Sequence, residues 1–530
     1  VCNIKCFISV ASKDRSQVKH LFDVLSIFEA KSCVDYTFLE DFYKDVVSVE
    51  YTPEERHAVL MYFLTSFKKR TSTPSELVSA LRLVVLPMLE HTLKDVAADP
   101  VKMAEAKIVI TEEAVESVVV DLLETADDEN SAVHSEPMRI QLLRLGTLLI
   151  RNLPDELVSH RKELIKFGWN HLKSEDSGAK QWAFVNVCHF LEAYQAPEKI
   201  VLQVFVALLR ACQPEAKELV RQALGALTPA LPKRLPQGDH KYPIWIRYTK
   251  KILVEEGHSL PHLIHVWNLI VQHESHFYPS RAQFVPQMVN SLSRLGLPSS
   301  SPPENRVLSI SLVELILDWE AARVKRVTEG ATAKEDDAKE EEEPEPEPEP
   351  EPAATSSKRT RRDSAGEKEK PAGKRTRGND GKKGKRAAEE AEDDEDEDPK
   401  GKKDKESIMP SSAEKDKDVD MGDADDIDLD DKSAKSDKGK AAPEVVAPPD
   451  ADDFKPSTAM EEIMVNFLVR MAFLTGEAKD KEMIALHART VALLRRALSA
   501  WPDANIKFAF IEKLLASASA NGGDATGTLR

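Results

Sequence analysis

Several histidines crowd into one short stretch of the sequence, where they could act as metal ligands. They are His258, His262, His265, His273 and His276. His262 and His265 are three residues apart, so they share a face if the stretch is helical. A zinc site also needs further ligands and hydrogen-bonding partners that orient them, and the histidines alone do not provide these. We expect histidines on helix surfaces, with no metal and no other cofactor.

Cys188 beside His189 is the pair that most resembles a nucleophile with its general base. Adjacent residues point to different faces of a helix, so these side chains are not expected to cooperate. A buried small thiol is the usual role of such a cysteine. The sequence has neither a glycine-rich phosphate loop nor a Gly-x-Ser-x-Gly nucleophile turn. We expect no catalytic residues, and therefore no enzyme.

Asp416, Asp418 and Asp420 have the spacing of the first three ligands of a calcium-binding loop. Such a loop also needs a glycine at its tight turn and a bidentate glutamate at its end. Met421 and Ile427 stand at these two positions. The sequence therefore excludes a calcium site of this kind.

Two clusters of basic residues lie in the stretch KRTRRDSAGEKEKPAGKRTR, and KKGKR follows them. Two such clusters on one flexible spacer can occupy two acidic grooves of a nuclear import receptor, because the spacer raises the effective concentration of the second cluster. We therefore predict a nuclear localisation signal and a nuclear location. Its residues are Lys358, Arg359, Arg361, Arg362, Lys374, Arg375, Arg377, Lys382, Lys383, Lys385 and Arg386.

The basic clusters also fit charge-balanced low-complexity filler, and clustered Lys and Arg can contact nucleic-acid phosphates. Acidic runs such as AEEAEDDEDEDP oppose that contact, and no aromatic residues are interleaved for base stacking. We expect no direct sequence-specific nucleic-acid binding. The run DVDMGDADDIDLDD fits either a solubilising spacer or contact with basic partners such as histone tails.

The segment that holds these clusters cannot form a packed core. Residues 331–450 contain 39 Asp and Glu against 25 Lys and Arg, which accounts for 14 of the 18 excess negative charges of the chain. They contain no aromatic Phe, Trp or Tyr and only six Ile, Leu or Val. Burial of so few apolar groups cannot offset an ordering cost of about 1–2 kcal/mol per residue. We expect residues 328–455 to be a disordered, charged insertion.

The rest of the chain has the pattern of consecutive helices. Proline followed by an acidic residue recurs in five segments. They are TPEER, LPDEL, APEKI, QPEAK and PPENR, which begin at residues 52, 153, 196, 213 and 302. Proline at the first helical position loses no needed N–H, and a carboxylate there faces the positive end of the helix dipole. Long apolar-periodic runs follow these starts, without a convincing period-two strand. An all-α fold is predicted.

Helix starts near residues 137, 178 and 214 recur at about forty residues, which is the period of HEAT-like repeats of two helices each. In such an α-solenoid each helix packs on its hairpin partner and on neighbouring repeats. We predict a HEAT-like solenoid over residues 1–327, its continuation over 456–520, and a flexible tail over 521–530. A compact helical bundle is the weaker alternative.

The segment SPPENRVLSISLVELILDWE, residues 301–320, is unusual among these helices. Its polar residues Ser311, Glu314 and Asp318 form one narrow stripe, and nearly every other position is apolar. A helix of this kind must be covered behind and on both flanks. We expect the stripe to be the exposed ridge of a stacked helix.

The cysteines and the hydropathy of the sequence indicate which cellular compartment the protein occupies. Five cysteines without a regular framework argue against a disulfide-stapled secreted protein and fit a reducing compartment. No apolar run is long enough to cross a bilayer, and the first residues lack the features of a signal peptide. We expect no membrane association, and we expect the chain, which begins at Val1, to be a fragment of a longer protein.

Residues 242–320, with MEEIMVNFLVRMAF and WPDANIKFAFIEKLL beyond the insertion, resemble the central HEAT region of the transformation/transcription domain-associated protein family. The resemblance runs from about residue 14 to about residue 519, apart from the insertion. Members are relatives of the phosphatidylinositol-3-kinase-related kinases whose kinase domain has lost its catalytic residues. They are scaffolds of SAGA-type and related histone acetyltransferase complexes. The resemblance therefore implies a non-catalytic scaffold section whose partners are transcription activators and acetyltransferase-complex subunits.

Two other classes of function share this architecture. Importin-like transport or assembly factors also stack HEAT repeats, although an importin offers acidic grooves to cargo and does not usually carry a bipartite signal of its own. The regulatory solenoid of an active kinase of the same superfamily is the other alternative. The family's FAT and pseudokinase regions have no counterpart in the sequence, so nothing known of them is carried over.

Overall fold

The computed structural model describes residues 2–29, 35–124, 135–174, 176–238, 240–340, 454–476, 480–507 and 509 of the chain. Every regular element within these ranges is a helix, and none of the described residues forms a β-strand. The predicted all-α class is therefore confirmed. By their contacts, the described residues within Val1–Ala333 and Val419–Arg530 belong to one compact unit.

The first part of the chain folds into short helices. Three of the segments are π-helical: η2 continues α3, η4 continues α8, and η3 joins α5 directly to α6. The elements are α1 (Cys2–Ala11), α2 (Val18–Asp23), η1 (Val24–Glu29), α3 (Thr37–Asp41), η2 (Phe42–Val47), α4 (Pro53–Lys68), α5 (Pro74–Ala80), η3 (Leu81–Val85), α6 (Leu86–Thr92), α7 (Pro100–Val109), α8 (Glu112–Glu116) and η4 (Ser117–Glu124).

The middle of the chain has longer helices in hairpins. They are α9 (Glu136–Asn152), η6 (Val158–His160), α10 (Arg161–Leu172), α11 (Ser177–Ala193), α12 (Glu198–Arg210), η7 (Pro214–Ala216), α13 (Lys217–Arg234), α14 (Ile244–Glu256), α15 (Leu260–Gln272), α16 (Glu274–Phe277), η8 (Tyr278–Gln283), α17 (Val285–Gly296) and α18 (Pro303–Glu340). Two further helices follow the long gap in the described residues, α19 (Thr458–Gly476) and α20 (Lys481–Ala500).

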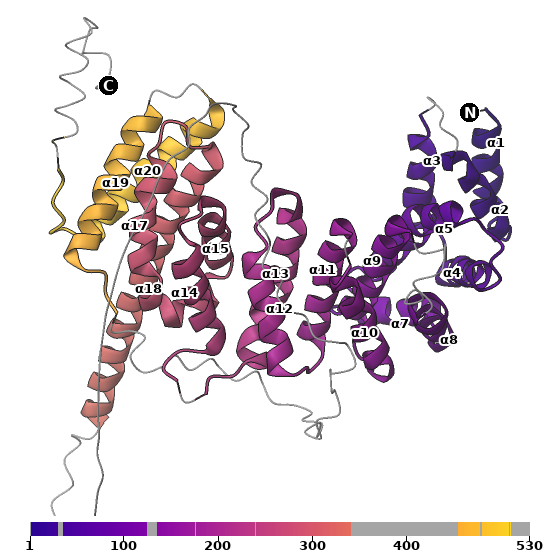
Figure 1. The fold of residues 1–530 in the computed structure, drawn as a ribbon, viewed down its shortest axis with the longest axis horizontal. Helices are drawn as coiled ribbons and strands as arrows, with labels where there is room; N and C mark the ends of the chain where they lie inside the picture. Colours follow the sequence, from indigo (N-terminus) through magenta and orange to yellow (C-terminus); the bar gives the residue numbers. More distant parts are fainter. Residues whose placement is uncertain are drawn as a thin grey trace, which may run out of the picture. The chain divides into compact units, whose positions relative to one another are not determined.

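Neighbouring hairpins pack side by side in sequence order. Helix α11 lies against both α9 and α13, while α10 pairs with α11 and α12 pairs with α13 (Figure 1). Helix α12 also packs on α14 of the next hairpin, and α14 packs on α15. Each helix therefore buries its apolar residues against its hairpin partner and against adjacent hairpins, as the HEAT-like prediction requires.

Proline marks most of the helix starts that the sequence predicts. Pro53 and Pro303 are the first residues of α4 and α18. Pro214 opens the 3₁₀ turn that leads into α13, and Pro197 directly precedes α12. Thr52 adds a capping box to α4, because its hydroxyl accepts from the Glu55 N–H while the Glu55 carboxylate accepts from the Thr52 N–H.

The predicted helix start at Pro154 is wrong. The chain turns after this proline, passes through η6 and enters α10 only at Arg161. Two features hold the turn in place. The hydroxyl of Tyr194 donates to the Pro154 carbonyl at 2.6 Å, and Leu157 is 1% exposed in the core. The Pro154 carbonyl therefore has a hydrogen-bond donor without the backbone N–H that a helix starting here would supply.

Helix α18 extends past the predicted boundary at residue 327 and ends at Glu340. Glu320 is the last buried residue in the part of α18 up to residue 328, beyond which burial is not described. Extending an existing helix costs far less than nucleating one, and VKRVTEGATAKEDDAKE contains mostly good helix formers. Residues 341–453 of the expected insertion, and 510–520 and the tail, lie outside the described residues.

Buried arginines tie neighbouring hairpins together through backbone carbonyls. Arg234, near the end of α13, is 4% exposed. Its guanidinium donates to the carbonyls of Leu191 and Glu192 at 2.7 Å each, and to the Gln195 side chain. These carbonyls belong to the last turn of α11 and lack partners within their own helix. One side chain therefore satisfies the end of the preceding hairpin.

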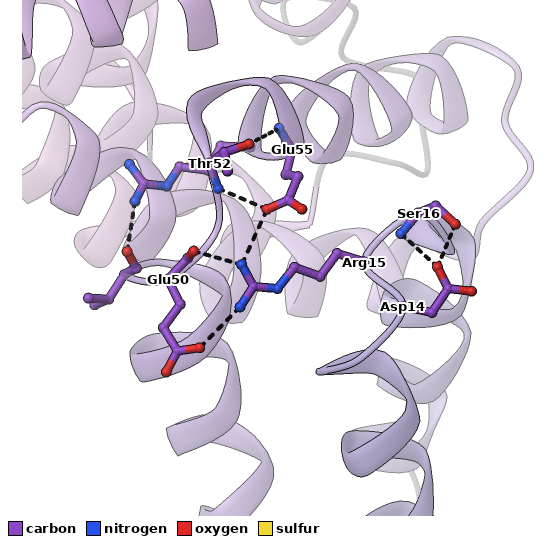
Figure 2. A network of polar contacts seen from close by, with 8 residues as sticks. Asp14, Arg15, Ser16, Glu50, Thr52 and Glu55 are labelled. Atoms are coloured by element: carbon purple, nitrogen blue, oxygen red, sulfur yellow. Dashed lines mark hydrogen bonds and ion pairs between the residues drawn. The ribbon is translucent and has the colours of Figure 1, made fainter.

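A similar arginine fixes the start of α4, as Figure 2 shows. Arg15, in the turn after α1, donates through Nη1 to the Glu50 carbonyl at 2.8 Å and pairs through Nη2 with the Glu50 carboxylate at 3.2 Å. Its Nη1 also lies 3.5 Å from Glu55 Oε2, which belongs to the capping box. The guanidinium stacks 5.1 Å from the centroid of the Tyr51 ring. The contact joins the first helices to the α4 hairpin.

Replacement of Leu315 by Asp tests the burial of α18. Leu315 is 3% exposed, so an unpaired carboxylate there loses its hydration between packed helices. We expect a fall in the free energy of unfolding of about 3 kcal/mol or more, or loss of the folded state. Leu474→Asp on α19 is the matched control, because Leu474 is 47% exposed. Equal melting temperatures for the two variants would contradict the burial of Leu315.

Candidate functional site: the junction of α17–α20

The residues of the predicted nuclear localisation signal, from Lys358 to Arg386, lie outside the described residues, as do the acidic runs and Asp416, Asp418 and Asp420. The structure does describe the helices on both sides of this segment. Helix α18 precedes it and α19 follows it. We call the region where α17, α18, α19 and α20 meet the junction.

The polar stripe on α18 is the contact surface for two arginines of α20. Arg489 donates from Nε to Glu314 Oε2 at 3.1 Å and from Nη2 to Ser311 Oγ at 3.0 Å. Arg496, seven residues further along α20, pairs with Asp318 at 2.6 Å. The stripe therefore meets a matching stripe of opposite charge.

The expectation that Ser311, Glu314 and Asp318 form an exposed ridge is thus only partly right, because Asp318 is exposed whereas Ser311 and Glu314 are half-buried. The carboxylate side chains of Glu314 and Asp318 keep 35% and 47% of their exposure, so they are partly covered by α20. Residues 314 and 489 are 175 positions apart in the sequence, and no local pattern on α18 indicates that partner. Figure 1 shows α20 and α19 beside α17 and α18.

Close packing between α17 and α19 supports the same arrangement. Gly296, at the end of α17, lies against the ring of Phe467 on α19, which is 2% exposed. A Cβ at this position would come within 3.0 Å of the ring and 2.6 Å of Ser309 Oγ on α18. Three helices therefore approach one another at a position that only glycine fits without displacement.

A stacked aromatic and cationic cluster lies where the chain returns after the undescribed segment. The guanidinium of Arg281 is 4.3 Å from the centroid of the Tyr278 ring, and that of Arg326 on α18 is 4.5 Å from the same centroid. Arg281 is 2% exposed and donates from Nη2 to the Phe454 carbonyl at 3.4 Å. The ring of Trp319 packs edge-on against Tyr278. Phe454, the first described residue after the gap, is thereby held against η8.

Two nearly buried carboxylates complete the junction. Glu320 on α18 is 8% exposed and accepts two hydrogen bonds from Arg323, at 2.9 and 2.7 Å. Glu461, in the first turn of α19, is 5% exposed, and its nearest cation is Lys455 Nζ at 3.8 Å. Burial raises the pKa of Glu461, Lys455 opposes that change, and the nearby carboxylates of Glu320 and Asp503 add to it.

The junction holds different elements together, since Arg489 and Arg496 pair with carboxylates of α18 and Arg281 donates to the Phe454 carbonyl. Among the described residues, no group of three or more His, Cys, Asp or Glu side chains is arranged to hold a metal ion. No helix in the described ranges combines the length and hydropathy that a membrane crossing needs. A small groove of about 280 Å³ opens between α15, α18 and α20, with Glu304 and Glu482 among its lining residues.

The five histidines singled out in the sequence do not gather at one point. His258 is exposed and lies 3.1 Å from the Glu255 carbonyl. His265 Nε2 lies 2.9 Å from the Leu208 carbonyl, and burial lowers the pKa of this ring. Burial also lowers the pKa of His276, and that of His273 to about 4. These three rings are partly buried, so the prediction of surface histidines is only partly right.

The prediction for Cys188 is confirmed, since this thiol is fully buried and burial raises its pKa. His189 instead contacts Glu192, with 3.0 Å between Nδ1 and Oε2. A different cysteine contact, between Cys212 and His262, joins residues 50 positions apart and has no local signal in the sequence. Only their approach in the folded chain brings them together.

The hairpins and their lateral packing define an α-solenoid, a class of protein whose repeats bind other macromolecules along their surface. A match with the family described as the Tra1 HEAT repeat ring region covers residues 2–527, which is nearly the whole chain. The chain therefore belongs to this family.

Related proteins carry names from transcription. The probable transcription-associated protein 1 of Dictyostelium discoideum is 39% identical over 325 residues, which are 61% of this chain and 7% of that protein. The transformation/transcription domain-associated protein of Homo sapiens is 29% identical over 60% of this chain and 8% of that protein. The SAGA complex/NuA4 acetyltransferase complex subunit TRA1 of Saccharomyces cerevisiae is 34% identical over 35% of this chain and 5% of that protein. The chain thus spans less than a tenth of the length of these relatives.

A double-mutant cycle tests the α18–α20 contact. We expect Arg489→Met and Glu314→Gln to show a coupling energy of about 0.5–1 kcal/mol in thermal unfolding, because the pair is only partly exposed to solvent. The pair Lys251 and Glu255 within α14 is the control, at 60% and 47% side-chain exposure, with an expected coupling of at most about 0.5 kcal/mol. A coupling of zero between Arg489 and Glu314 would show that the two helices do not meet through these side chains.

Glu461→Gln tests the buried carboxylate. The pKa of Glu461 is raised above the ordinary value of 4.5, so the folded chain binds the proton more tightly than the unfolded chain. This contribution to stability is fully present below the unfolded pKa and is lost as the pH rises through the folded pKa. The glutamine variant should therefore melt at a higher temperature than the unchanged chain at pH 7, with a smaller difference near pH 4. Glu482→Gln, at an exposed position of α20, should show no such pH-dependent gain; a gain of the same size would refute the assignment.

Proposed function

We propose that this chain is a non-catalytic section of the scaffold subunit of a SAGA-type or related histone acetyltransferase complex in the nucleus. The observation that carries the proposal is the family match over residues 2–527. Two relatives, from Saccharomyces cerevisiae and Schizosaccharomyces pombe, are named as SAGA complex/NuA4 acetyltransferase complex subunits. Transcription activators and other subunits of such a complex are the proposed partners.

The contacts of the described residues are consistent with a structural role in which the chain binds other proteins. Two buried arginines, Arg234 and Arg281, donate to backbone carbonyls of other elements, while the buried Glu320 pairs with Arg323 on its own helix. Repeats that pack only on their neighbours leave long surfaces open to other proteins. A chain of this kind contributes rigid surface to a complex, and the chemical step belongs to another subunit.

The segment between α18 and α19 is proposed to carry the nuclear address. Its basic clusters include Lys358 to Arg362 and Lys374 to Arg377. The junction supports this role, because the helices on either side of the segment are tied together by Arg489, Arg281 and Phe454. A long excursion from such a junction is tolerated, since the entropic cost of closing a loop grows only slowly with its length. Acidic runs in the same segment are proposed to contact histones or to act as spacers.

Affinity purification of the tagged chain from nuclear extract tests the scaffold function. We expect mass spectrometry to recover acetyltransferase-complex subunits. Leu315→Asp should lose them, and Leu474→Asp, at an exposed position, should keep them. Recovery of cargo proteins that Ran-GTP releases would favour an importin-like factor instead. Kinase activity associated with the full parent chain would favour the regulatory solenoid of an active kinase.

A reporter fused to residues 350–405 tests the nuclear address. Replacement of Lys374, Arg375 and Arg377 by alanine should lower nuclear accumulation several-fold, because one of the two clusters no longer binds the import receptor. Replacement of Lys400, Lys402 and Lys403 removes the same charge outside the clusters and should leave accumulation unchanged. Equal accumulation of the two variants would remove the case for the signal.

A further inference from the structure

Cys212 lies at a meeting point of three helices. It follows the last residue of α12, Arg210, in the loop before η7. Its Sγ is 3.3 Å from Nε2 and 3.5 Å from Nδ1 of His262, in the first turn of α15. The residue is partly exposed to solvent. A thiol and an imidazole are therefore within proton-transfer distance at a position that small reagents can reach.

Each ring nitrogen of His262 has a polar neighbour. Its Nε2 lies 3.1 Å from Glu256 Oε2, at the end of α14, and its Nδ1 lies 3.1 Å from Ser259 Oγ. A protonated ring would thus find an acceptor for each of its N–H groups. Glu256 is itself oriented by Arg210, whose Nε donates to Oε1 at 2.8 Å. Four side chains therefore form a connected series, Arg210, Glu256, His262 and Cys212.

A thiolate at Cys212 is also favoured by the helix next to it. The thiol contacts the side chain of His262 in the N-terminal turn of α15, the end of a helix that carries a partial positive charge. His265, one turn further along α15, faces the Leu208 carbonyl, and burial lowers its pKa. His265 therefore tends to stay neutral, and His262 is the ring that has a carboxylate beside it.

We propose that Cys212 is a nucleophilic thiol that is modified by soft electrophiles, including hydrogen peroxide, with His262 as the proton acceptor. His262 takes the thiol proton on Nδ1, which lies 3.5 Å from Sγ, while its Nε2–H faces Glu256. The thiolate then attacks one oxygen of the peroxide. An S–O bond forms and the O–O bond breaks, so sulfur is oxidised by two electrons to sulfenic acid. The hydroxide that leaves takes up the proton held by His262 and becomes water. This modification site is independent of the proposed scaffold function.

The other described cysteines provide internal controls. Cys2 and Cys6 are exposed, and Cys188 is buried. Alkylation of the whole chain by iodoacetamide can be followed at each cysteine by mass spectrometry. At pH 6.5, Cys212 should react about ten times faster than Cys2 and Cys6, and Cys188 should react slowest. The advantage of Cys212 should shrink at pH 8.5, where exposed thiols ionise as well.

Variants separate the role of His262 from simple exposure. His262→Gln should bring the rate at pH 6.5 down to that of Cys2, and Glu256→Gln should lower it several-fold. His258→Gln, which changes an exposed ring near the same turn, should leave the rate unchanged. With hydrogen peroxide as the reagent and dimedone as the trap for sulfenic acid, Cys212 should be labelled first.

Two results would overturn the proposal without any need for a variant. One is a rate for Cys212 at pH 6.5 no higher than that of Cys2 in the unchanged chain. The other is first labelling of Cys2 or Cys6 by dimedone. Persistence of the full excess rate in a folded His262→Gln chain, checked by its melting temperature, would also exclude His262 as the proton acceptor.

Discussion

Lateral burial of helix α18 is the constraint on which the second half of the structure depends. Leu312, Val313, Ile316 and Leu317 are each at most 2% exposed, so the helix needs neighbours on several sides at once. The side that carries the polar stripe is partly covered by α20, through Arg489 and Arg496. Gly296 at the end of α17 has no side chain, so the ring of Phe467 on α19 can pack closely against it. The contacts of α18 thus join helices from both sides of the undescribed segment.

Charged groups inside the stack make the packing specific. Burial of an ion is costly unless its hydrogen bonds are satisfied, and the arginines of the stack satisfy theirs at fixed places. Arg234 bonds to the last carbonyls of α11, and Arg281 bonds to the carbonyl of Phe454. Leucines and valines can slide along one another with little loss, whereas a guanidinium loses its carbonyl partner if a helix shifts by a turn. We infer that such residues fix the register of successive hairpins.

The packed hairpins and their buried polar contacts agree with the proposed role of a scaffold that offers a surface to other proteins. In the described residues, polar groups connect elements that lie side by side, and the junction holds the two ends that bound a long, highly charged segment. The thiol and imidazole at Cys212 and His262 belong to the same kind of place, a meeting point of hairpins. There a modification would act on the contacts of α12, α14 and α15. All of these features lie within residues 2–527, which match the Tra1 HEAT repeat ring family.

The sequence by itself determined which segments are helices and where most of them begin. Proline at the first turn, acidic neighbours and apolar periodicity act within a few residues, so they are legible in a single sequence. The repeat length of about forty residues followed from the same marks, and it identified the stacked hairpins. The composition of α18 also indicated that it would be covered on several sides, although it could not indicate by what.

Only the tertiary structure decided which surfaces meet. The stripe on α18 was expected to face solvent, but α20 partly covers it, for example through Arg489, which is 175 residues from Glu314 in the sequence. Pro154 looked like a helix start, but the Tyr194 hydroxyl takes its carbonyl and a turn results. Cys212 and His262 carried no local sign of each other. These outcomes depend on contacts between residues distant in the chain, and the physical reason is that packing selects partners by shape and charge in space, which local sequence patterns do not encode.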